Sequence, residues 1–273
     1  MIDLSINPEE VTIVITEFIK TYVENSRCRG VVIGLSGGVD SAVTAVLCKK
    51  ALGGDRVTCL FLPDESTPEI DFRDYKEVTD IFNLRCEVKD ISSIVESIKE
   101  NSVYPPDKMA LANIKARVRM ILLFEYANTT NTLVCGTSNK SEMLIGYFTK
   151  YGDGGVDIMP LGDLYKTQVW ELARHLGIPN SIISKPPSAG LYKGQTDEEE
   201  IQMKYEKLDK ILAGLERKMK IEDIARFSGT TIEEVLRIKD MRIKTQHKRR
   251  VPLIPKVGLR TPGLDWRSPI LEG

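Results

Sequence analysis

A short segment rich in glycine and serine has the composition of an anion-binding loop. It reads Gly34-Leu35-Ser36-Gly37-Gly38-Val39-Asp40-Ser41, between a β-branched apolar run and a run with helical spacing. In that place backbone N–H groups and the helix dipole favour an anion, glycines let the backbone approach it, and hydroxyls can donate to it. The segment lacks the lysine of the common nucleotide-binding loop, so Asp40 would face a phosphate through Mg²⁺. The alternative, a merely tight turn, would not require two serines, two glycines and an acid together.

Other charged residues could complete such a site. Glu142 follows a later apolar run, and it would meet Asp40 if the two runs form neighbouring strands, giving a Mg²⁺ site shared with phosphate oxygens. Arg117 lies on a long helical run, Lys166 begins another, and a basic run occupies 247–250. Each has an ordinary alternative: a solvated acid for Glu142, a helix-surface residue for Arg117 and Lys166, and a solvated tail for 247–250.

Together these segments resemble a known family. The pattern S-G-G-x-D-S at 36–41 resembles the signature of the N-type ATP pyrophosphatases, which cleave ATP to AMP and pyrophosphate while activating a carbonyl oxygen. Three further segments resemble, in this order, the ammonia-dependent NAD synthetases: N-I-K-A-R-V-R-M at 113–120, G-T-S-N-K-S-E at 136–142 and G-Y-F-T-K-Y-G-D-G-G-V-D at 146–157. The resemblance runs from about residue 10 to residue 250.

The resemblance implies a carbon–nitrogen ligase. It would amidate deamido-NAD with ammonia through an adenylated intermediate, giving NAD, AMP and pyrophosphate, with ATP as co-substrate and Mg²⁺ as cofactor. The implied catalytic residues are Asp40 and Lys166, and the implied metal ligands are Asp40 and Glu142. The implied ATP contacts are Gly34, Leu35, Ser36, Gly37, Gly38, Val39, Asp40, Ser41, Thr137, Lys166 and Ser188. The implied deamido-NAD contacts are Arg117, Lys150, Asp157, His247 and Lys248.

The chain departs from the family pattern at two places. Ser188 stands where bacterial members usually carry threonine, and it keeps the hydroxyl. After Arg250 the chain continues through Pro252, Pro255 and Trp266, where bacterial members end in a short acidic-aromatic tail.

The resemblance also implies a homodimer with the deamido-NAD site where the subunits meet. A physical reason stands beside it, because the predicted helix 108–126 carries more apolar residues than one core-facing stripe can hold: Met109, Ile114, Val118, Ile121, Leu122 and Phe124. A two-fold partner is the commonest way to cover a second apolar face. The alternative is burial within the same chain, under the C-terminal helices.

Composition excludes several other classes of protein. The net charge of -1 over 273 residues provides no global field for nucleic acid or an anionic membrane. The start lacks a secretory signal, and no apolar stretch approaches the ~20 residues that span a bilayer. Five scattered cysteines suit reduced thiols in a cytoplasm, and two histidines leave little for a histidine metal cluster.

Particular residues argue against two rival functions. A tRNA-thiolating or guanylate-forming pyrophosphatase is the nearer one, but the cysteines are spread and the 150–157 segment argues against it. The run 221–235 resembles a helix-turn-helix, yet its second helix is acidic at Glu233 and Glu234, where DNA contact requires hydrogen-bond donors.

Alternating strands and helices predict the frame that positions these residues. Strands are expected at 30–35, 57–62, 85–88 and 132–135, and helices at 8–25, 42–52, 68–83, 108–126 and 166–176. This order predicts an α/β fold with a doubly wound parallel sheet flanked by helices, similar to the adenine nucleotide alpha hydrolases. A single domain over 1–273 is expected, with a mobile loop at 184–196, two or three short helices from about 197 to 243, and an extended tail from 246.

Overall fold

Four parallel strands form the sheet at the centre of the fold, in the order β3-β2-β1-β4. The computed structural model, which describes residues 2–192 and 194–261, places them at Val31–Gly34 (β1), Val57–Phe61 (β2), Arg85–Val88 (β3) and Leu133–Cys135 (β4). Val31 pairs with Val57 on one side and with Leu133 on the other. All four strands were predicted, each within two residues at either end. The prediction of a parallel sheet is confirmed.

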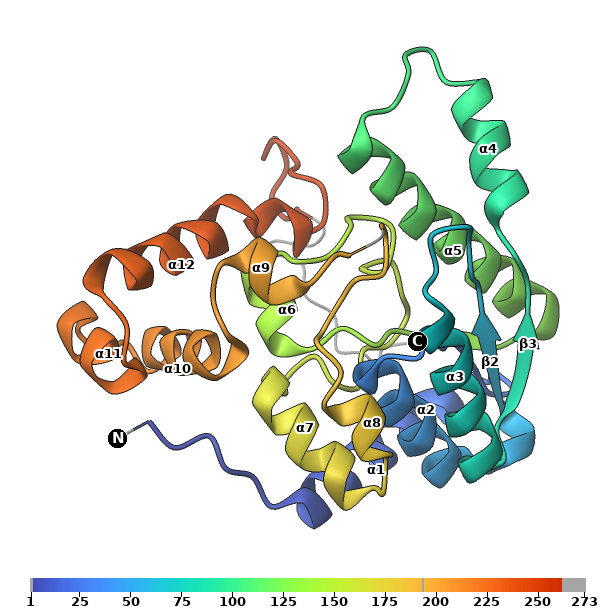
Figure 1. Cartoon of the computed structure of the whole chain (residues 1–273), viewed down its shortest axis with the longest axis horizontal. Helices are drawn as coiled ribbons and strands as arrows, with labels where there is room; N and C mark the ends of the chain where they lie inside the picture. Colours follow the sequence, from blue (N-terminus) through green and yellow to red (C-terminus); the bar gives the residue numbers. More distant parts are fainter. Residues whose placement is uncertain (1, 193, 262–273) are drawn as a thin grey trace.

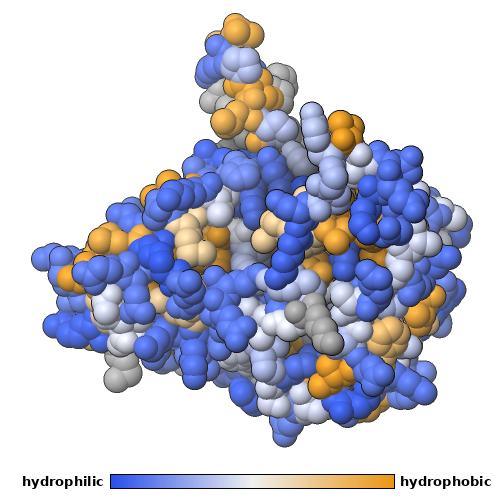
Figure 2. All heavy atoms as spheres, turned by 45° about the horizontal axis from the view of Figure 1, so that its top comes forward, coloured by the Kyte–Doolittle hydropathy of each residue, from blue (hydrophilic) through white to orange (hydrophobic). Residues whose placement is uncertain are grey.

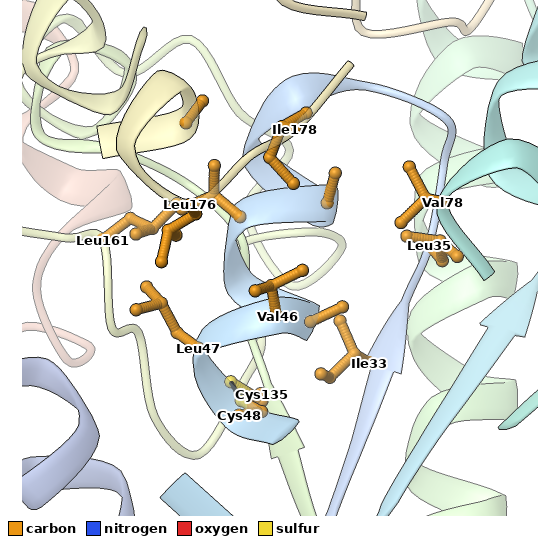
Figure 3. Close-up of a cluster of buried hydrophobic side chains, with 14 of the residues drawn as sticks. Ile33, Leu35, Val46, Leu47, Cys48, Val78, Cys135, Leu161, Leu176 and Ile178 are labelled. Atoms are coloured by element: carbon orange, nitrogen blue, oxygen red, sulfur yellow. Dashed lines mark hydrogen bonds between the residues drawn. The ribbon is translucent and has the colours of Figure 1, made fainter. Parts of the chain in front are cut away.

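Helices cover both faces of this sheet (Figure 1). On one face α1 (Pro8–Asn25), α2 (Val39–Leu52), α3 (Glu69–Phe82) and α7 (Lys166–His175) bury Ile33 and its neighbours, as Figure 3 shows for the side chains around α2. On the other face α4 (Ser92–Glu100) and α5 (Lys108–Thr130) pack over Val32. Successive strand residues point to opposite faces, so a strand buried on both sides is apolar throughout. The doubly wound arrangement is confirmed.

The C-terminal helices build a second core beside the sheet. Three of them, α10 (Tyr205–Glu216), α11 (Ile221–Ser228) and α12 (Ile232–Lys244), enclose Tyr205, Leu208 and Ile224 together with the short α6 (Lys140–Ile145). With α9 (Asp197–Ile201) they make four helices over the described residues from 197 to 244, where two or three were predicted. The five-residue α9 is too short to show helical spacing in the sequence. A single domain over 1–273 stays a prediction.

Other boundaries differ from the prediction for local reasons. Helix α2 begins at Val39 instead of residue 42, because extended Gly38 is its N-cap. The helices α4, α6 and α8 (Asn180–Ile183) were not predicted, and each is at most nine residues long. The tail has one short 3₁₀ helix, Gln246–Lys248, and no helix or strand over 249–261. Its remaining part, with Trp266, lies outside the described residues.

The surface agrees with the composition. Figure 2 shows one face that is mostly hydrophilic, with hydrophobic side chains in small separate groups. No helix in the described part of the chain has the length and hydropathy that crossing a bilayer requires. Large exposed apolar side chains do occur on α5, where Met109 is 59% exposed and Ile121 is 56% exposed.

Candidate active site

The site lies at the switch point of the sheet, where the chain has added β2 and β3 on one side of β1 and then adds β4 on the other side. Strand β1 stands between β2 and β4, and the segments that follow β1 and β4 leave the same edge of the sheet side by side. In open parallel sheets a crevice forms at this point and receives ligands. Asp40 lies in the first turn of α2, directly after β1, and Glu142 in the first turn of α6, after β4.

Four polar side chains meet in this crevice. The ammonium of Lys166, at the start of α7, contacts the Asp40 carboxylate and lies 3.5 Å from Oε1 of Glu142. Nδ2 of Asn139 donates to Oδ1 of Asp40 at 3.0 Å and to Oε1 of Glu142 at 2.7 Å. The structure therefore brings together Asp40 and Glu142, whose meeting was predicted, with Lys166 and Asn139. Asn139 was missed, although its place three residues before Glu142 has the spacing of a helix cap.

Local structure holds Glu142 in place. Asn139 is the N-cap of α6: its Oδ1 accepts a hydrogen bond from the N–H of Glu142 at 3.0 Å, and Oε2 of Glu142 accepts one from the N–H of Asn139 at 3.3 Å. This reciprocal cap satisfies two helix N–H groups and fixes the glutamate side chain beside the crevice. Glu142 was predicted on the loop after the fourth strand, and the structure places it at the third position of a helix.

Asp209 on α10 fixes the start of α7. Its carboxylate accepts hydrogen bonds from Oγ of Ser141 at 2.5 Å and from the N–H of Thr167 at 2.9 Å. The same Ser141 hydroxyl accepts a hydrogen bond from the N–H of Lys166 at 3.0 Å. The second core thus orients Lys166 through one buried carboxylate. No sequence motif indicated Asp209.

The electrostatics of the crevice favour an additional cation. The pKa of Glu142 is raised to about 8, mainly by burial. The Lys166 ammonium opposes this rise, and the carboxylates of Asp40 and Asp197 add to it. Burial by itself would lower the pKa of Lys166, but the carboxylates of Asp40, Glu142 and Asp197 raise it above its usual value. Burial also raises the pKa of Asp197, whose Oδ1 has no hydrogen-bond partner among the described residues. One ammonium faces three carboxyl groups, which leaves an excess of negative charge when they are ionised.

The glycine-rich segment is folded back on itself by its own serines. Oγ of Ser41 accepts a hydrogen bond from the N–H of Ser36 at 3.2 Å and donates one to the carbonyl of Gly38 at 2.9 Å. Oγ of Ser36 accepts one from the N–H of Gly38 at 3.3 Å. Gly37 has a φ of 79°, in the left-handed region that favours glycine. The segment forms a tight loop at the N-terminus of α2, as an anion-binding loop requires.

A second hollow opens beside the crevice. This pocket of about 310 Å³ is lined by Ser138, Phe148, Lys150, Tyr151, Lys248 and Arg249, among others. Nζ of Lys248 donates to the carbonyls of Gly146 and Phe148, at 2.7 Å each, which holds the tail against the 146–154 segment. Two of the residues predicted to bind deamido-NAD, Lys150 and Lys248, therefore line one pocket rich in cations.

The remaining predicted residues lie around these two hollows or apart from them. The guanidinium of exposed Arg117 reaches the carbonyl of Lys150 at 3.4 Å, and His247 is exposed on the 3₁₀ helix of the tail. Oδ2 of Asp157 accepts a hydrogen bond from the N–H of Val134 at 2.7 Å, so one of its oxygens orders the sheet edge. Thr137 is half-buried, two residues after β4. Ser188 is exposed, and its Oγ accepts a hydrogen bond from the N–H of Gly190 at 3.1 Å.

A buried ionic cluster on α5 was also missed. Lys115 donates to Oδ1 of Asp64 at 3.1 Å, and Arg119 donates to Oδ2 of Asp64 at 2.8 Å. Lys115 also reaches the carbonyl of Leu191 at 3.3 Å. Burial raises the pKa of Asp64, but hydrogen bonds from Ser66 and the nearby cations lower it below its usual value overall. Lys115 and Arg119 lie four residues apart on α5, and this spacing on one helix face was the available signal for the cluster.

Comparison with known proteins identifies the family. The model of the NAD synthase family matches residues 11–252. The chain is 45% identical over 252 residues to the NH(3)-dependent NAD(+) synthetase of Methanocaldococcus jannaschii, covering 91% of this chain and 97% of that one. The chain belongs to the NAD synthase family. The predicted resemblance is confirmed.

Solved structures of similar proteins share this fold over most of the chain. The NH3-dependent NAD synthetase of Campylobacter jejuni superposes with a TM-score of 0.79 at 32% identity, covering 92% of this chain and all of that one. The NMN synthetase of Francisella tularensis superposes with a TM-score of 0.83 at 34% identity, with the same coverage. The fold therefore occurs in similar proteins with two different names.

Proposed function

We propose that this chain amidates deamido-NAD with ammonia at the expense of ATP. The meeting of Lys166, Asp40 and Glu142 at the ends of β1 and β4 carries the proposal, because it places two carboxylates and one ammonium directly beside a glycine-rich loop at a helix N-terminus. The adjoining pocket with Lys150 and Lys248 suits the pyrophosphate and carboxylate of deamido-NAD.

The proposed reaction needs positioning more than a protein nucleophile. The nicotinate carboxylate attacks the α-phosphorus of ATP, the bond to pyrophosphate breaks, and an acyl adenylate forms. Ammonia then attacks the acyl carbon, the bond to the phosphate oxygen breaks, and AMP leaves. The N–H groups of the 36–41 loop and the ammonium of Lys166 stabilise the charge on the departing pyrophosphate. Holding both substrates in line supplies the rest of the acceleration.

Asp40 and Glu142 fit a Mg²⁺ ion. Both carboxylates already lie around one positive charge, the Lys166 ammonium, and hard cations prefer oxygen ligands. No group of three or more acidic, histidine or cysteine side chains that could hold a metal occurs within residues 2–192 and 194–261, so phosphate oxygens would supply the remaining ligands. The ion would neutralise charge on the phosphates while Asn139 keeps the two carboxylates apart and oriented.

The other predicted contacts remain part of the proposal. Thr137 and Ser188 are assigned to ATP together with the 34–41 loop, and the Ser188 hydroxyl is exposed to a ligand. Arg117, Asp157 and His247 are assigned to deamido-NAD with Lys150 and Lys248. We also place the protein in the cytoplasm, consistent with the described cysteines, all of which are free thiols.

We propose that two copies of the chain form a homodimer through the outer face of α5. The alternative, cover by the C-terminal helices, receives no support, because α10, α11 and α12 pack on α6 and on one another. Met109 and Ile121 stay exposed on α5, and Arg117 lies between them in sequence. A second copy would cover these side chains and bring its own Arg117 to the deamido-NAD pocket.

The decisive experiment is incubation of the purified chain with ATP, Mg²⁺, deamido-NAD and ammonium. The expected products are NAD, AMP and pyrophosphate in equal amounts. Release of ADP and phosphate in their place would overturn the adenylation mechanism.

The similarity to an NMN synthetase supports a second candidate substrate. A chain that made NMN by the same chemistry would amidate nicotinate mononucleotide, which lacks the adenylate half of deamido-NAD. The rates measured in parallel with deamido-NAD and with nicotinate mononucleotide, each at a limiting concentration, give the ratio of the two kcat/KM values. We expect deamido-NAD to be preferred, and a preference for the mononucleotide would make the second candidate the function.

A further inference from the structure

Lys185 joins three parts of the structure that are far apart in the sequence. Its ammonium donates to the carbonyl of Gly37 at 2.7 Å, to Oδ1 of Asp71 at 2.9 Å and to Oδ2 of Asp74 at 2.7 Å. An ammonium has three N–H donors, so all of them are used. Lys185 thereby ties the start of the 184–192 segment to the phosphate-binding loop and to α3.

The loop is already tight at the point where Lys185 holds it. Gly37 has a φ of 79°, and a Cβ added there would lie 2.8 Å from the backbone oxygen of Asp71. The Gly37 carbonyl and the Gly38 N–H belong to one rigid peptide plane, so fixing the oxygen also fixes the direction of the N–H. That N–H lies on the loop that is expected to receive the pyrophosphate of ATP, and here it points to Oγ of Ser36.

The charges around Lys185 exclude a direct role as a phosphate ligand. Asp71 and Asp74 flank its ammonium, and the fully buried Asp74 is also bound by Arg73 at 2.9 Å. Two cations therefore face two carboxylates in a closed network. The lysine of the common nucleotide-binding loop points at the phosphates, but Lys185 reaches its loop through a backbone carbonyl and has no free donor for a phosphate.

We infer that Lys185 is a positioning residue of the ATP site, which holds the Gly37–Gly38 peptide in the orientation that binds pyrophosphate. The inference rests on the proposed function for the identity of the nucleotide. A positioning role predicts a selective effect that a purely structural lysine would not have. Loss of Lys185 should weaken the binding of ligands that contact the loop through their β- and γ-phosphates, and it should leave the binding of AMP almost unaffected.

Calorimetric binding of two ligands tests this distinction. The Lys185→Met variant keeps the length of the side chain and removes its donors. We expect an ATP analogue with a methylene bridge between the α- and β-phosphates to bind at least about tenfold more weakly, with AMP within about twofold of wild type. An unchanged affinity for the analogue, or an equal loss for both ligands, would overturn the inference.

Two further variants separate positioning from folding. Lys49→Met is the matched control, because the Lys49 ammonium also bonds to backbone carbonyls, those of Phe82 and Asn83, but lies away from the loop. It should leave both affinities unchanged, and a loss equal to that of Lys185→Met would contradict the inference. The double variant Lys185→Met/Asp71→Asn removes one charge of each sign. It should fold even if the single variant does not, and it should keep the selective loss; recovery of analogue binding would contradict the inference.

The test also separates the inference from the proposed function. Binding of the analogue and of AMP is measured without turnover. A wild-type chain that binds both ligands but makes no NAD from deamido-NAD would overturn the proposed function, and the comparison of the variants would still stand.

Discussion

The ammonium of Lys166 contacts the carboxylate of Asp40 although 126 positions of sequence separate the two residues. Both side chains stand at helix N-termini, α7 for Lys166 and α2 for Asp40. Taking two like charges out of water is costly unless an opposite charge lies between them. Lys166 supplies that charge for Asp40 and Glu142, so the carboxylates can lie close together before any nucleotide binds.

Replacement of either carboxylate should stop adenylation and leave the fold intact. Asp40→Asn and Glu142→Gln keep the size of each side chain and remove the charge that a hard cation requires. Pyrophosphate release at saturating Mg²⁺ measures the effect, with exposed Glu206→Gln as the matched control. A variant that keeps more than about a tenth of the wild-type rate, ~1.4 kcal/mol of barrier or less, would show that its residue is not a metal ligand.

Ammonium should be the nitrogen donor for the purified chain. A glutamine amidohydrolase requires its own nucleophile, and no cysteine among the described residues has a plausible catalytic group beside it: Cys48 and Cys135 contact each other at 3.6 Å in the core. The hydrogen bond with Cys135 and burial raise the pKa of the Cys48 thiol well above its usual range, which opposes nucleophilic use. NAD formation with glutamine at the rate seen with ammonium would contradict this expectation.

The sheet and the loop were predictable because their signals are local. The runs 31–34 and 57–61 are apolar except for Thr58, as strands buried on both faces are, and glycine with serine follows the first of them. Glu142 and Asp40 could be paired from topology alone, since neighbouring parallel strands end at one edge. The missed elements α4, α6 and α8 are short, at most nine residues each.

The supporting residues of the site were not predictable for a different reason. Asp209 acts on Lys166 through Ser141, and Lys185 holds Gly37 from 148 positions away. Such contacts depend on how the second core and the 184–192 segment pack against the sheet, which no spacing in the sequence reveals. An isolated aspartate or lysine reads as a surface residue until its neighbours in space are known.

Asp209 should make stability depend on pH. Burial raises its pKa to about 6, even though hydrogen bonds from Ser141 and Thr167 lower it. The unfolded value is about 3.9, so the folded state binds the proton more tightly; this contribution to the free energy of unfolding is complete below about pH 4 and is lost as pH rises through about 6. Between pH 4 and pH 7 the free energy of unfolding measured in urea should fall by about 2 kcal/mol more in wild type than in Asp209→Asn. Exposed Asp55→Asn is the control, and parallel pH curves for wild type and Asp209→Asn would rule the effect out.

The active species should be a homodimer whose deamido-NAD site is formed by both subunits. Arg117 is exposed on α5, and the exposed Ile121 lies one turn further along the same helix. In a single chain this apolar face would remain in water. In a two-fold dimer the same face of the second copy would cover it. Within one chain Arg117 reaches the carbonyl of Lys150, which lines the pocket, so an experiment has to separate service of its own site from service of the partner's site.

Subunit mixing decides whether Arg117 serves the partner's site. Chains with Arg117→Ala and chains with Asp40→Asn should each be inactive alone, because every site in either homodimer lacks one group. In a heterodimer, one site combines Asp40 of one chain with Arg117 of the other and is whole. A 1:1 mixture should therefore recover about a quarter of wild-type activity, since random pairing puts half of the chains in heterodimers with one whole site each. Activity of a monomer in sedimentation, or no recovery after subunit exchange has been confirmed, would exclude a shared site.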